Sequence, residues 1–573
     1  MMQNRVIATL NKKIKQINSK VTLSLKDDCA LLTGYSDDWD EIVHIGRLVA
    51  KTKKFYSVIN DIKLNNFVEP TMRRPLIEDN AYDGMKVDVL VIGGGIVGAA
   101  ILRELTKYNL KVALVEKEDD LALHASSRND GCIHVGIDLS SKTNKLKYLR
   151  RSIPVYEKLA QDLDVEYDKM GQIVAFKSNW ERLIYLLLKL RIKKNGIQET
   201  TFLNRKKLFE REPNLNKVAK FGVLFGTGAC ICPYNMTIAL AESAVINGAQ
   251  VLLSTAVTSM EVKNKEIVSV QTNHGRIFPK VVVNAAGVFS DVIAEMAEDK
   301  FFSIHPRKGT NAILDKKAKD KLMFQSTTIY EGLRKTAKTH TKGGGVVPTV
   351  DGNILVGPTA NETPYREDFT TSREEINQVF SKHKNNAPHL SQRDIITYFS
   401  GIRAATYEED FVIQKGKWTR NIVHAAGIQS PGLTAAPAIA DDVVAYACEL
   451  LGKVSRNENF NPIRKGITRV NKLSYEERNK LILNHPDYGQ IVCRCEEISK
   501  GEIIDALHRP IVVASVDAIK KRTRAGMGRC QGGFCQPLIV DIIAKETQNK
   551  LESINKKGDG KILLYQTKGE QHE

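Results

Sequence analysis

The sequence contains no long apolar segment. No uninterrupted apolar run approaches the roughly 20 residues that a helix needs to span a bilayer. The first residues, MMQNRVIATLNKKIKQ, also lack the apolar core of a secretory signal peptide. These absences argue against an integral membrane protein and against signal-directed secretion. We expect a cytoplasmic protein, at most peripheral at the inner face of a membrane.

Cysteine is scarce, with nine among 573 residues. In a reducing compartment these residues are thiols or metal ligands, which excludes a fold held together by disulfide bonds. The remaining composition, with 42% hydrophobic and 26% charged residues, is that of an ordinary globular protein. The length leaves room for several domains and a large core.

Acidic residues are outnumbered, since 66 Asp and Glu stand against 84 Lys and Arg and give a net charge of +18. This balance favours anionic partners, such as a phosphorylated substrate, an acidic protein or a membrane surface. Because the basic residues are spread along the chain, a lysine-rich solvated surface explains the charge equally well. No stretch is typical of a nucleic-acid-binding module, and we expect no nucleic-acid partner.

A strand, a glycine turn and a helix follow one another over 87–108. Their glycines, Gly93, Gly95 and Gly98, form a G-x-G-x-x-G motif. The first allows a tight turn, the second lets a pyrophosphate approach the backbone, and the third lets the helix pack on the strand. The helix N-terminus offers N–H groups to phosphates. A second strand ends at Glu116, where a carboxylate can hold a ribose, so this unit predicts dinucleotide binding.

Residues 1–64 are predicted to form a small module with the element order αββαβ. The predicted elements cover Val6–Ile17, Val21–Leu25, Ala30–Thr33, Trp39–Lys51 and Phe55–Leu64. The order resembles a BON domain, a family associated with membrane or protein attachment, and the alternative is a docking appendage without chemistry. Residues 65–84 hold two prolines and scattered charges and are predicted to be a linker.

The segment after Glu116 supplies further candidate site residues. Ser126 and Ser127 offer short hydroxyl groups for a phosphate or a ribityl chain. His134 follows in a glycine-rich loop, where it is either structural or catalytic.

Strands and helices alternate through the rest of the central region. A buried strand over 281–287 is expected to return beside the cofactor, and a hairpin over 343–360 is expected to turn at 351–353. Arg403 follows an apparent strand end. A glycine/proline loop over 427–437 leads into a predicted helix, Ala438–Leu451, whose first N–H groups can meet an electron-rich ring edge.

These pieces together resemble the flavin-dependent oxidoreductases of the D-amino-acid-oxidase fold over 85–455. The motifs are VIGGGIVGAAILREL, VEKE, SSRNDGCIHVG, VVVNAAGVFSD, PTVDGNILVGPTA, SGIRAAT and GIQSPGLTAAPAIA. The resemblance implies an α/β fold with an FAD-binding Rossmann-like domain (about 85–150, 222–300 and 400–455) and an inserted α+β substrate domain (about 151–221 and 301–399). It also implies FAD bound by Gly93, Gly95, Gly98, Glu116, Ser126, Ser127, Val257, Gly287, Gly427, Pro431, Gly432, Leu433 and Thr434.

Within that fold, the motifs are most similar to the large subunits of anaerobic glycerol-3-phosphate dehydrogenases and, next, to L-2-hydroxyglutarate dehydrogenases. Both oxidise a secondary alcohol on an anionic substrate. The resemblance implies that Arg403 grips the anion through its planar guanidinium, helped by Arg307 or Lys342. His134 is the candidate catalytic base.

Two features leave this assignment open. Arg403 could instead form a structural ion pair with one of the acids at 408–410. In addition, Thr310-Asn311 stands where glycerol-3-phosphate relatives often carry an acidic–aromatic pair, which puts the substrate in doubt.

A second chemical centre is indicated near the C-terminus. Cys493 and Cys495 form C-x-C, and Cys530 and Cys535 form C-x4-C. Four thiolates are what a 2Fe–2S cluster requires, with two on each iron. Structural zinc and a redox dithiol are the alternatives, although zinc sites more usually show C-x2-C pairs.

Together with the flanking RTRAGMGRCQGGFC, this pattern resembles a bacterioferritin-associated-ferredoxin-like 2Fe–2S domain over 487–548. Residues 456–486 are predicted to be a linker, and 549–573 a loosely ordered tail. Glycines allow backbone N–H groups to reach the sulfurs, and Arg522, Arg524 and Arg529 are expected to offset the negative charge of the cluster.

The sequence therefore favours an FAD-dependent dehydrogenase of a small anionic secondary alcohol, with sn-glycerol 3-phosphate the first choice and 2-hydroxy acids the alternative. Electrons are expected to pass through the 2Fe–2S cluster to a partner protein or a quinone system. Two other classes remain open: an electron-transfer subunit without a substrate of its own, and an attachment protein with a vestigial flavin site.

Overall fold

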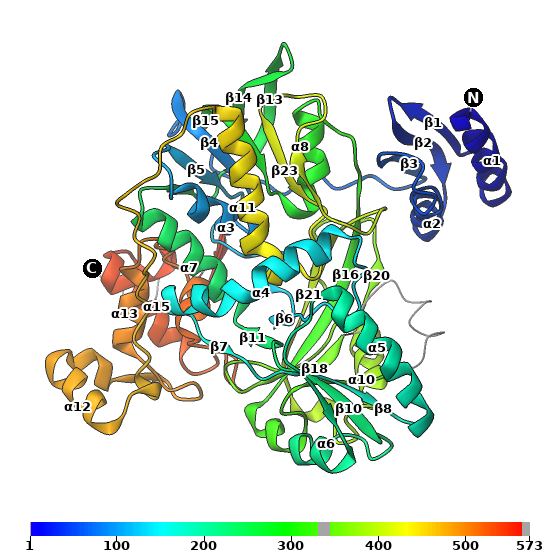
Figure 1. The fold of residues 1–573 in the computed structure, drawn as a ribbon. Helices are drawn as coiled ribbons and strands as arrows, with labels where there is room; N and C mark the ends of the chain where they lie inside the picture. The colour runs from blue at the N-terminus through cyan, green and yellow to red at the C-terminus, as the bar shows by residue number, and fades with distance from the viewer. Residues whose placement is uncertain (1, 331–343, 564–573) are drawn as a thin grey trace.

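A computed structural model describes residues 2–330 and 344–563 of the chain. Within these ranges no helix is both long enough and apolar enough to cross a membrane. Figure 1 shows the N-terminal module at one side of the molecule and the C-terminal helices at the other, with the large α/β domain between them.

The largest sheet is built around the predicted dinucleotide unit. Its parallel centre consists of β4 (Met85–Ile92), β5 (Val112–Val115) and β15 (Gly275–Asn284), with β4 in the middle. The outer strands are β12 (Gln250–Leu252), β13 (Val257–Lys263), β14 (Glu266–Thr272), β22 (Val412–Lys415) and β23 (Ile422–Ala426). Since β15 lies beside β4, the strand predicted over 281–287 does return to this sheet, but it begins at Gly275 and ends at Asn284.

Both faces of this sheet are covered, as its apolar strands require. Val89 and Val91 of β4 belong to the core formed with α3 (Ile96–Leu105), α7 (Pro233–Ile246) and α11 (Gly432–Leu451). Leu90 and Ile92 point the other way and pack with α8 (Ser290–Met296). The helix α4 (Asn144–Asp162) packs on α11.

Helix α11 begins at Gly432, six residues before the predicted start, so the prediction of a loop to Pro437 was wrong. A proline inside a helix leaves the carbonyl four residues earlier without its N–H partner. Here that carbonyl belongs to Leu433, and the hydroxyl of Tyr156 donates to it at 3.1 Å. A tertiary contact therefore stabilises a helix that its own sequence disfavours.

Strand β21 (Ile395–Thr406) corrects a second boundary. Arg403 lies inside this strand rather than after its end, because β21 pairs along its length with β16 (Ile304–Leu314). Gly401, within this strand, allows close approach of Arg128, since a Cβ at Gly401 would overlap that side chain.

The substrate domain contains two sheets. In one, β16 pairs with β21, with β19 (Ile354–Gly357) and with β20 (Asn361–Glu362), while β18 (Gly345–Pro348) pairs with β19. Helix α10 (Arg373–His383) packs on this sheet. The other consists of β17 (Ser326–Ile329), β8 (Gln172–Phe176), β10 (Phe221–Phe225) and β9 (Thr200–Leu203), near α5 (Arg182–Asn195) and α6 (Arg205–Arg211). The antiparallel pairing of β18 and β19 confirms the predicted hairpin. A small sheet of β6 (Cys132–Ile133), β11 (Ala229–Ile231) and β7 (Tyr167–Asp168) completes the domain.

The N-terminal module has the predicted αββαβ order, and its resemblance to BON domains stays a prediction. Its elements are α1 (Met2–Ile17), β1 (Thr22–Lys26), β2 (Cys29–Ser36), α2 (Trp39–Ala50) and β3 (Val58–Leu64). The module contacts the substrate domain closely. The ring of Tyr407 lies against Gly46, and Arg47 forms an ion pair with Glu362 at 2.5 Å.

The predicted linker over 456–486 contains a helix, α12 (Tyr475–Asn484), which sequence reasoning missed. Its signal is a capping box, in which Ser474 and Glu477 satisfy each other's backbone N–H groups. Farther along, the predicted loose tail forms a hairpin of β26 (Asn555–Lys557) and β27 (Gly560–Lys561). Its Gly558 donates its N–H to Asp119 at 2.6 Å, and residues 564–573 lie outside the described chain.

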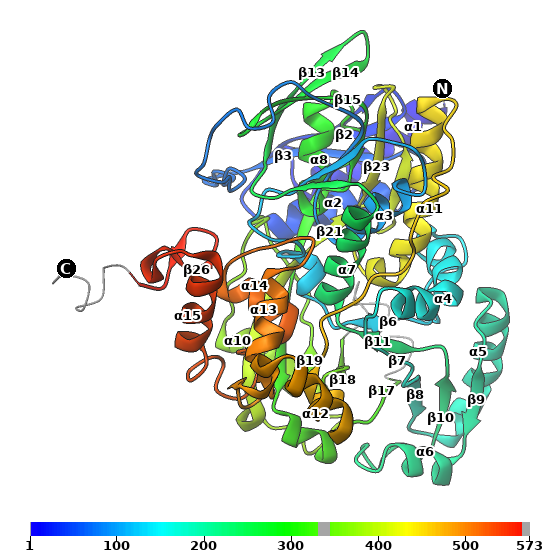
Figure 2. The ribbon, with the colours of Figure 1, turned by 90° about the vertical axis from the view of Figure 1, so that its left-hand side faces the viewer.

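The C-terminal domain is a small helical unit, seen from the side in Figure 2. It consists of β24 (Ile491–Cys493), β25 (Ile498–Ser499), α13 (Lys500–Leu507), α14 (Val516–Thr523) and α15 (Gln536–Thr547). Cys493, Cys535 and apolar residues of all three helices form its own core.

Glu212 gives the substrate domain a defined pH dependence. It is fully buried after α6 and accepts hydrogen bonds from Phe324 N (3.0 Å), Gln325 N (2.7 Å) and the Thr327 hydroxyl (2.9 Å). Burial raises the pKa of Glu212 from 4.5 to about 7. The folded state therefore binds this proton more tightly than the unfolded state, and stability falls as the pH rises from about 4.5 through 7.

We expect Glu212→Gln to remove this dependence. At about 1.4 kcal/mol per pKa unit, wild type should lose up to about 3 kcal/mol relative to the variant between pH 4.5 and 8. Urea unfolding at pH 5 and pH 8, followed by fluorescence, measures the difference. Glu210→Gln, at an exposed position of α6, is the control. Parallel pH profiles for wild type and Glu212→Gln would contradict the assignment.

Candidate functional site

The glycine turn after β4 leaves space beside the N-terminus of α3. Gly93 has φ of +112°, and a Cβ at Gly98 would overlap the Gly93 carbonyl, so the helix can approach the strand only with glycine at both positions. Ser126 lies where predicted, since its hydroxyl oxygen accepts the Ile96 N–H at 2.8 Å. Ser127 instead donates to the His124 carbonyl at 3.4 Å. A pyrophosphate fits this end of α3.

Glu116 lies across the glycine turn, as expected for a ribose ligand. Its carboxylate accepts the N–H groups of Gly94 at 2.6 Å and Glu118 at 2.9 Å, and burial raises its pKa. The nearby cluster of Glu118, His124 and Glu367 has the spacing of a metal site. Lys117 and Arg73 already form ion pairs with these two glutamates, however, so the negative charge of the cluster is neutralised without a metal ion.

The other end of the predicted cofactor site gathers around the start of α11. His134 donates its backbone N–H to the Thr434 hydroxyl at 3.0 Å, and its Nε2 lies 3.4 Å from the Ser430 hydroxyl. Gly287 has φ of +56°, and a Cβ built there would meet only open space. His134 thus joins the loop after β6 to the N-terminus of α11, and Gly287 follows the end of β15.

The remaining predicted cofactor residues lie at the ends of strands β13 and β23 and at the start of α11. Val257 is the first residue of β13 and is buried. Gly427 follows β23 with φ of +65°, and a side chain there would overlap Thr406. Pro431, Gly432 and Leu433 form the first turn of α11, whose first N–H groups lack partners within the helix.

Arg403 and Arg307 lie opposite each other on β21 and β16, but their environments differ. Arg307 is 1% exposed and pairs with Glu362 at 2.8 Å and with Glu409. Although burial raises them, His305 and Arg307 lower the pKa values of Glu362 and Glu409 to about 2, and Arg47 contributes at Glu362. This network favours a structural role for Arg307 over the predicted substrate contact.

The guanidinium of Arg403 lies directly over Gly309. Any side chain at position 309 would overlap this guanidinium, so the arrangement requires glycine. Its Nη2 donates to the Thr359 carbonyl at 3.2 Å, whereas its buried Nη1 finds no acceptor among the described residues. Burial and the charge of Arg307 lower the pKa of Arg403 to about 10. An unpaired, buried cation of this kind fits an anionic ligand. In the described structure Arg403 forms no ion pair with the acids at 408–410.

Asn311 is a second polar side chain on the same face of this sheet, and sequence reasoning did not assign it a role. Every second residue of a strand lies on the same face, so residues 307, 309 and 311 of β16 share one face of the sheet. On the neighbouring strand β21 they are paired with Arg403, Gly401 and Phe399. Both polar atoms of the buried Asn311 side chain lack partners within the described chain. The predicted Lys342 lies outside the described residues.

The four candidate metal ligands converge in the C-terminal domain. The sulfurs of Cys495 and Cys530 are 3.5 Å apart, and Gly526 directs its N–H to the Cys493 sulfur at 3.5 Å. A hydrogen bond from the Cys535 thiol lowers the pKa of Cys493 to about 6. Although burial raises it, the backbone N–H groups of 532–534 lower the pKa of Cys530. Thiolates with backbone donors fit an iron–sulfur cluster.

The arginines expected to offset the charge of the cluster form ion pairs with carboxylates instead. Arg522 pairs with Asp120 at 2.8 Å, with both side chains 2% exposed. Arg529 pairs with Asp315 at 2.6 Å near the surface. Their charges are thus used to attach the C-terminal domain to the domains beside it.

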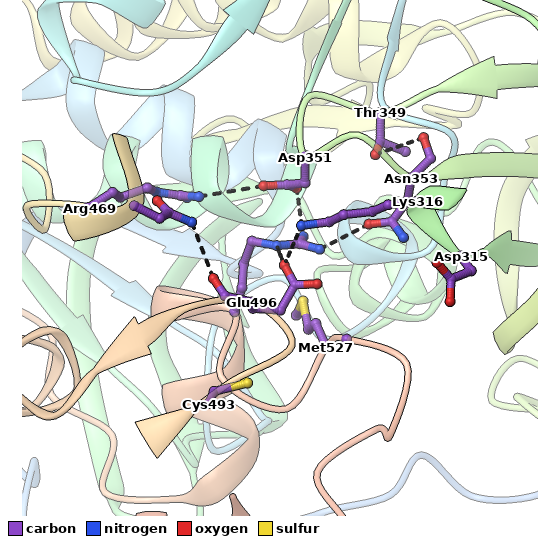
Figure 3. Close-up of polar contacts among 12 residues, drawn as sticks. Asp315, Lys316, Thr349, Asp351, Asn353, Arg469, Cys493, Glu496 and Met527 are labelled. Atoms are coloured by element: carbon purple, nitrogen blue, oxygen red, sulfur yellow. Dashed lines mark hydrogen bonds and ion pairs between the residues drawn. The ribbon is translucent and has the colours of Figure 1, made fainter. Parts of the chain in front are cut away.

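Arg524 is the centre of a buried network at this contact. It donates to Glu496 at 2.9 Å, to Asp351 at 2.6 Å and to Asn353 at 3.1 Å. Figure 3 shows Asp351 and Asn353, from the β18–β19 turn, facing Glu496, which follows the ligand Cys495. The turn of the substrate domain and the loop that carries the ligand are thereby fixed to each other.

We expect Arg524→Gln to loosen the C-terminal domain. Removing one partner of a buried ion pair costs about 3–5 kcal/mol, whereas the exposed Arg529 pair should contribute about 1 kcal/mol or less. Iron release to a chelator and hydrogen exchange over 491–535 should therefore accelerate in Arg524→Gln and change little in Arg529→Gln. Equal rates in the two variants would show that the buried network does not fix the domain.

Comparison with known proteins agrees with both sites. The family described as FAD dependent oxidoreductase matches residues 88–446, and the BFD-like 2Fe–2S binding domain matches residues 491–545. The chain is 37% identical over 478 residues to the glycerol 3-phosphate dehydrogenase of Caloramator mitchellensis, covering 83% of this chain and 98% of that relative.

More distant relatives are also named for the oxidation of glycerol 3-phosphate. One subunit of the anaerobic glycerol-3-phosphate dehydrogenase of Escherichia coli is 24% identical over 492 residues, covering 79% of this chain and 87% of that relative. The FAD-bound L-alpha-glycerophosphate oxidase of Mycoplasma pneumoniae superposes with a TM-score of 0.60 at 28% identity, over 66% of this chain and 98% of that structure. The chain therefore belongs to the FAD dependent oxidoreductase family, binds FAD, and carries a 2Fe–2S domain near its C-terminus.

Proposed function

We propose that this chain is a dehydrogenase that oxidises sn-glycerol 3-phosphate to dihydroxyacetone phosphate. The observation that carries the proposal is the buried Arg403, whose Nη1 has no partner among residues 2–330 and 344–563, on a flavoprotein whose relatives are named for glycerol 3-phosphate. When bound, FAD supplies the hydride acceptor and the cluster supplies a one-electron carrier.

In this proposal Arg403 binds the phosphate. A guanidinium forms two parallel hydrogen bonds with a phosphate, which fixes orientation as well as position. The slot over Gly309 holds the side chain, and the Thr359 carbonyl occupies only one of its N–H groups. Asn311, on the same sheet face, offers the substrate a donor and an acceptor.

His134 is proposed as the base that takes the hydroxyl proton. The start of α11 orients it from two sides, through Thr434 on its backbone and Ser430 beside Nε2. A neutral imidazole can accept a proton on its unprotonated ring nitrogen, which is the role of a general base. Loss of the hydroxyl proton lets the carbinol carbon release its hydride.

The final electron acceptor is proposed to be a partner protein or a quinone system. An enzyme that returned its electrons to oxygen directly from flavin would not need the cluster that the C-terminal domain binds.

Anaerobic mixing tests the proposal. Addition of sn-glycerol 3-phosphate should bleach the flavin absorbance of the purified holoprotein, and lactate, malate and L-2-hydroxyglutarate should not. If only a 2-hydroxy acid bleached the flavin, the substrate would be that acid and not sn-glycerol 3-phosphate. A protein that shows both chromophores but is reduced by none of these compounds would be an electron-transfer subunit.

Two substitutions should separate binding from chemistry. Arg403→Gln should raise KM and lower kcat/KM by about 100-fold or more, because it removes a charge-assisted contact. His134→Gln should lower kcat by about 100-fold or more at similar KM, since general-base catalysis contributes that much. Steady-state kinetics with a dye acceptor, at matched flavin content, measures both. Arg393→Gln, at an exposed position before β21, is the control. A wild-type KM in Arg403→Gln would rule out the proposed anion contact.

A further inference from the structure

The four cluster ligands form two pairs that differ in exposure. Cys493 and Cys535 are 1% and 2% exposed and belong to the core of the C-terminal domain. Cys495 is exposed and Cys530 is partly exposed, and their sulfurs lie 3.5 Å apart. A 2Fe–2S cluster takes two thiolates on each iron, so a cluster held here would have one pair of ligands in the protein interior and the other pair at the surface.

Apolar side chains lie beside the exposed edge. Phe534 is 84% exposed although it directly precedes the buried ligand Cys535, and its N–H is directed to the Cys530 sulfur. Leu538, one helical turn farther along α15, is 51% exposed. A phenylalanine this exposed gains nothing from burial in the monomer, and neighbouring exposed apolar side chains mark interaction sites.

Positive charge flanks these side chains. Arg494 is exposed between the ligands Cys493 and Cys495. Arg529, whose side chain is 64% exposed, directly precedes Cys530 and pairs at the surface with Asp315 at 2.6 Å, so among the described residues Arg494 supplies the uncompensated charge on this side. One exposed acid, Glu497, lies in the same ligand segment. An apolar centre with guanidinium groups at its rim is the usual composition of a protein interface, and it complements an acidic partner.

We propose that Phe534, Leu538, Arg494 and Arg529 form the docking surface of an acidic one-electron carrier protein. This inference rests on the proposed function only in requiring that the cluster delivers electrons outside the chain. Two carriers each gain one electron for each alcohol oxidised to a ketone, and two protons are released.

A protein occupant suits this surface better than a membrane does. Helices that bind anionic membranes carry a basic polar face beside a long apolar face. Helix α15 presents two acids, Asp541 and Glu546, and Lys545 pairs with Asp541 at 2.8 Å. The apolar part is confined to the end of α15 that adjoins the cluster ligands.

The test uses holoenzyme reduced anaerobically with dithionite, freed of excess reductant and mixed with an oxidised haem protein in a stopped-flow instrument. The probes are cytochrome b5, an acidic carrier, and cytochrome c, a basic one. Wild type should reduce cytochrome b5 faster, and salt should slow that reaction. Phe534→Ala should slow it about 10-fold or more, as loss of an interface anchor does. Arg494→Glu should slow it and remove its salt dependence.

Leu483→Ala is the matched control, because Leu483 is also 84% exposed but lies on α12. The electron paramagnetic resonance signal of the reduced cluster should be unchanged in every variant, which separates docking from cluster loss. Wild-type rates in Phe534→Ala and Arg494→Glu, or a preference for cytochrome c, would overturn the proposal. So would Phe534-dependent reduction of menaquinone in anionic vesicles without reaction with cytochrome b5. Because dithionite supplies the electrons, failure of glycerol 3-phosphate to bleach the flavin would leave this test intact.

Discussion

Buried pairing of guanidinium and carboxylate groups is the interaction on which the arrangement of this protein depends. Arg522 with Asp120 and Arg524 with Asp351 join the cluster domain to the flavin and substrate domains, and Arg47 with Glu362 joins the N-terminal module. Arg464 and Arg509, both outside the flavin domain, share the fully buried Glu242 of α7. In each case the chain brings a desolvated charge from one part to a complementary charge in another.

Such pairs determine position more than they add stability. Removing two charges from water is costly, and their mutual attraction offsets that cost only when the geometry is good and the remaining hydrogen bonds are made. An apolar contact tolerates small sliding, whereas a bidentate pair such as Arg522–Asp120 accepts only one placement. A redox protein in which two centres must keep a fixed separation benefits from that property.

Local patterns in the sequence predicted the parts of the site that depend on local structure. The glycine motif, the Asp-Gly turn between β18 and β19 and the paired cysteines each specify backbone geometry within a few residues. Helix α12 was missed although its capping box is local, but most other errors arose where distant residues decide the outcome. The early start of α11 depends on Tyr156, the pairing of Arg307 depends on Glu409, and Arg524 finds Asp351 and Asn353 173 and 171 positions earlier in the chain. Motif spacing within one segment cannot predict contacts between residues that are far apart in the sequence.

The short loop after β5 contacts both the glycine turn and the cluster domain. Glu116 lies over the glycine turn where the dinucleotide is expected, and four residues later Asp120 pairs with Arg522 of the cluster domain. Anything that orders one end of so short a loop reduces the entropy that remains to be lost at the other. We therefore expect cofactor loading and domain docking to be thermodynamically linked, and by reciprocity each would tighten the other by the same factor. Assembly would then be cooperative, so that an empty nucleotide site and a poorly seated iron–sulfur domain occur together.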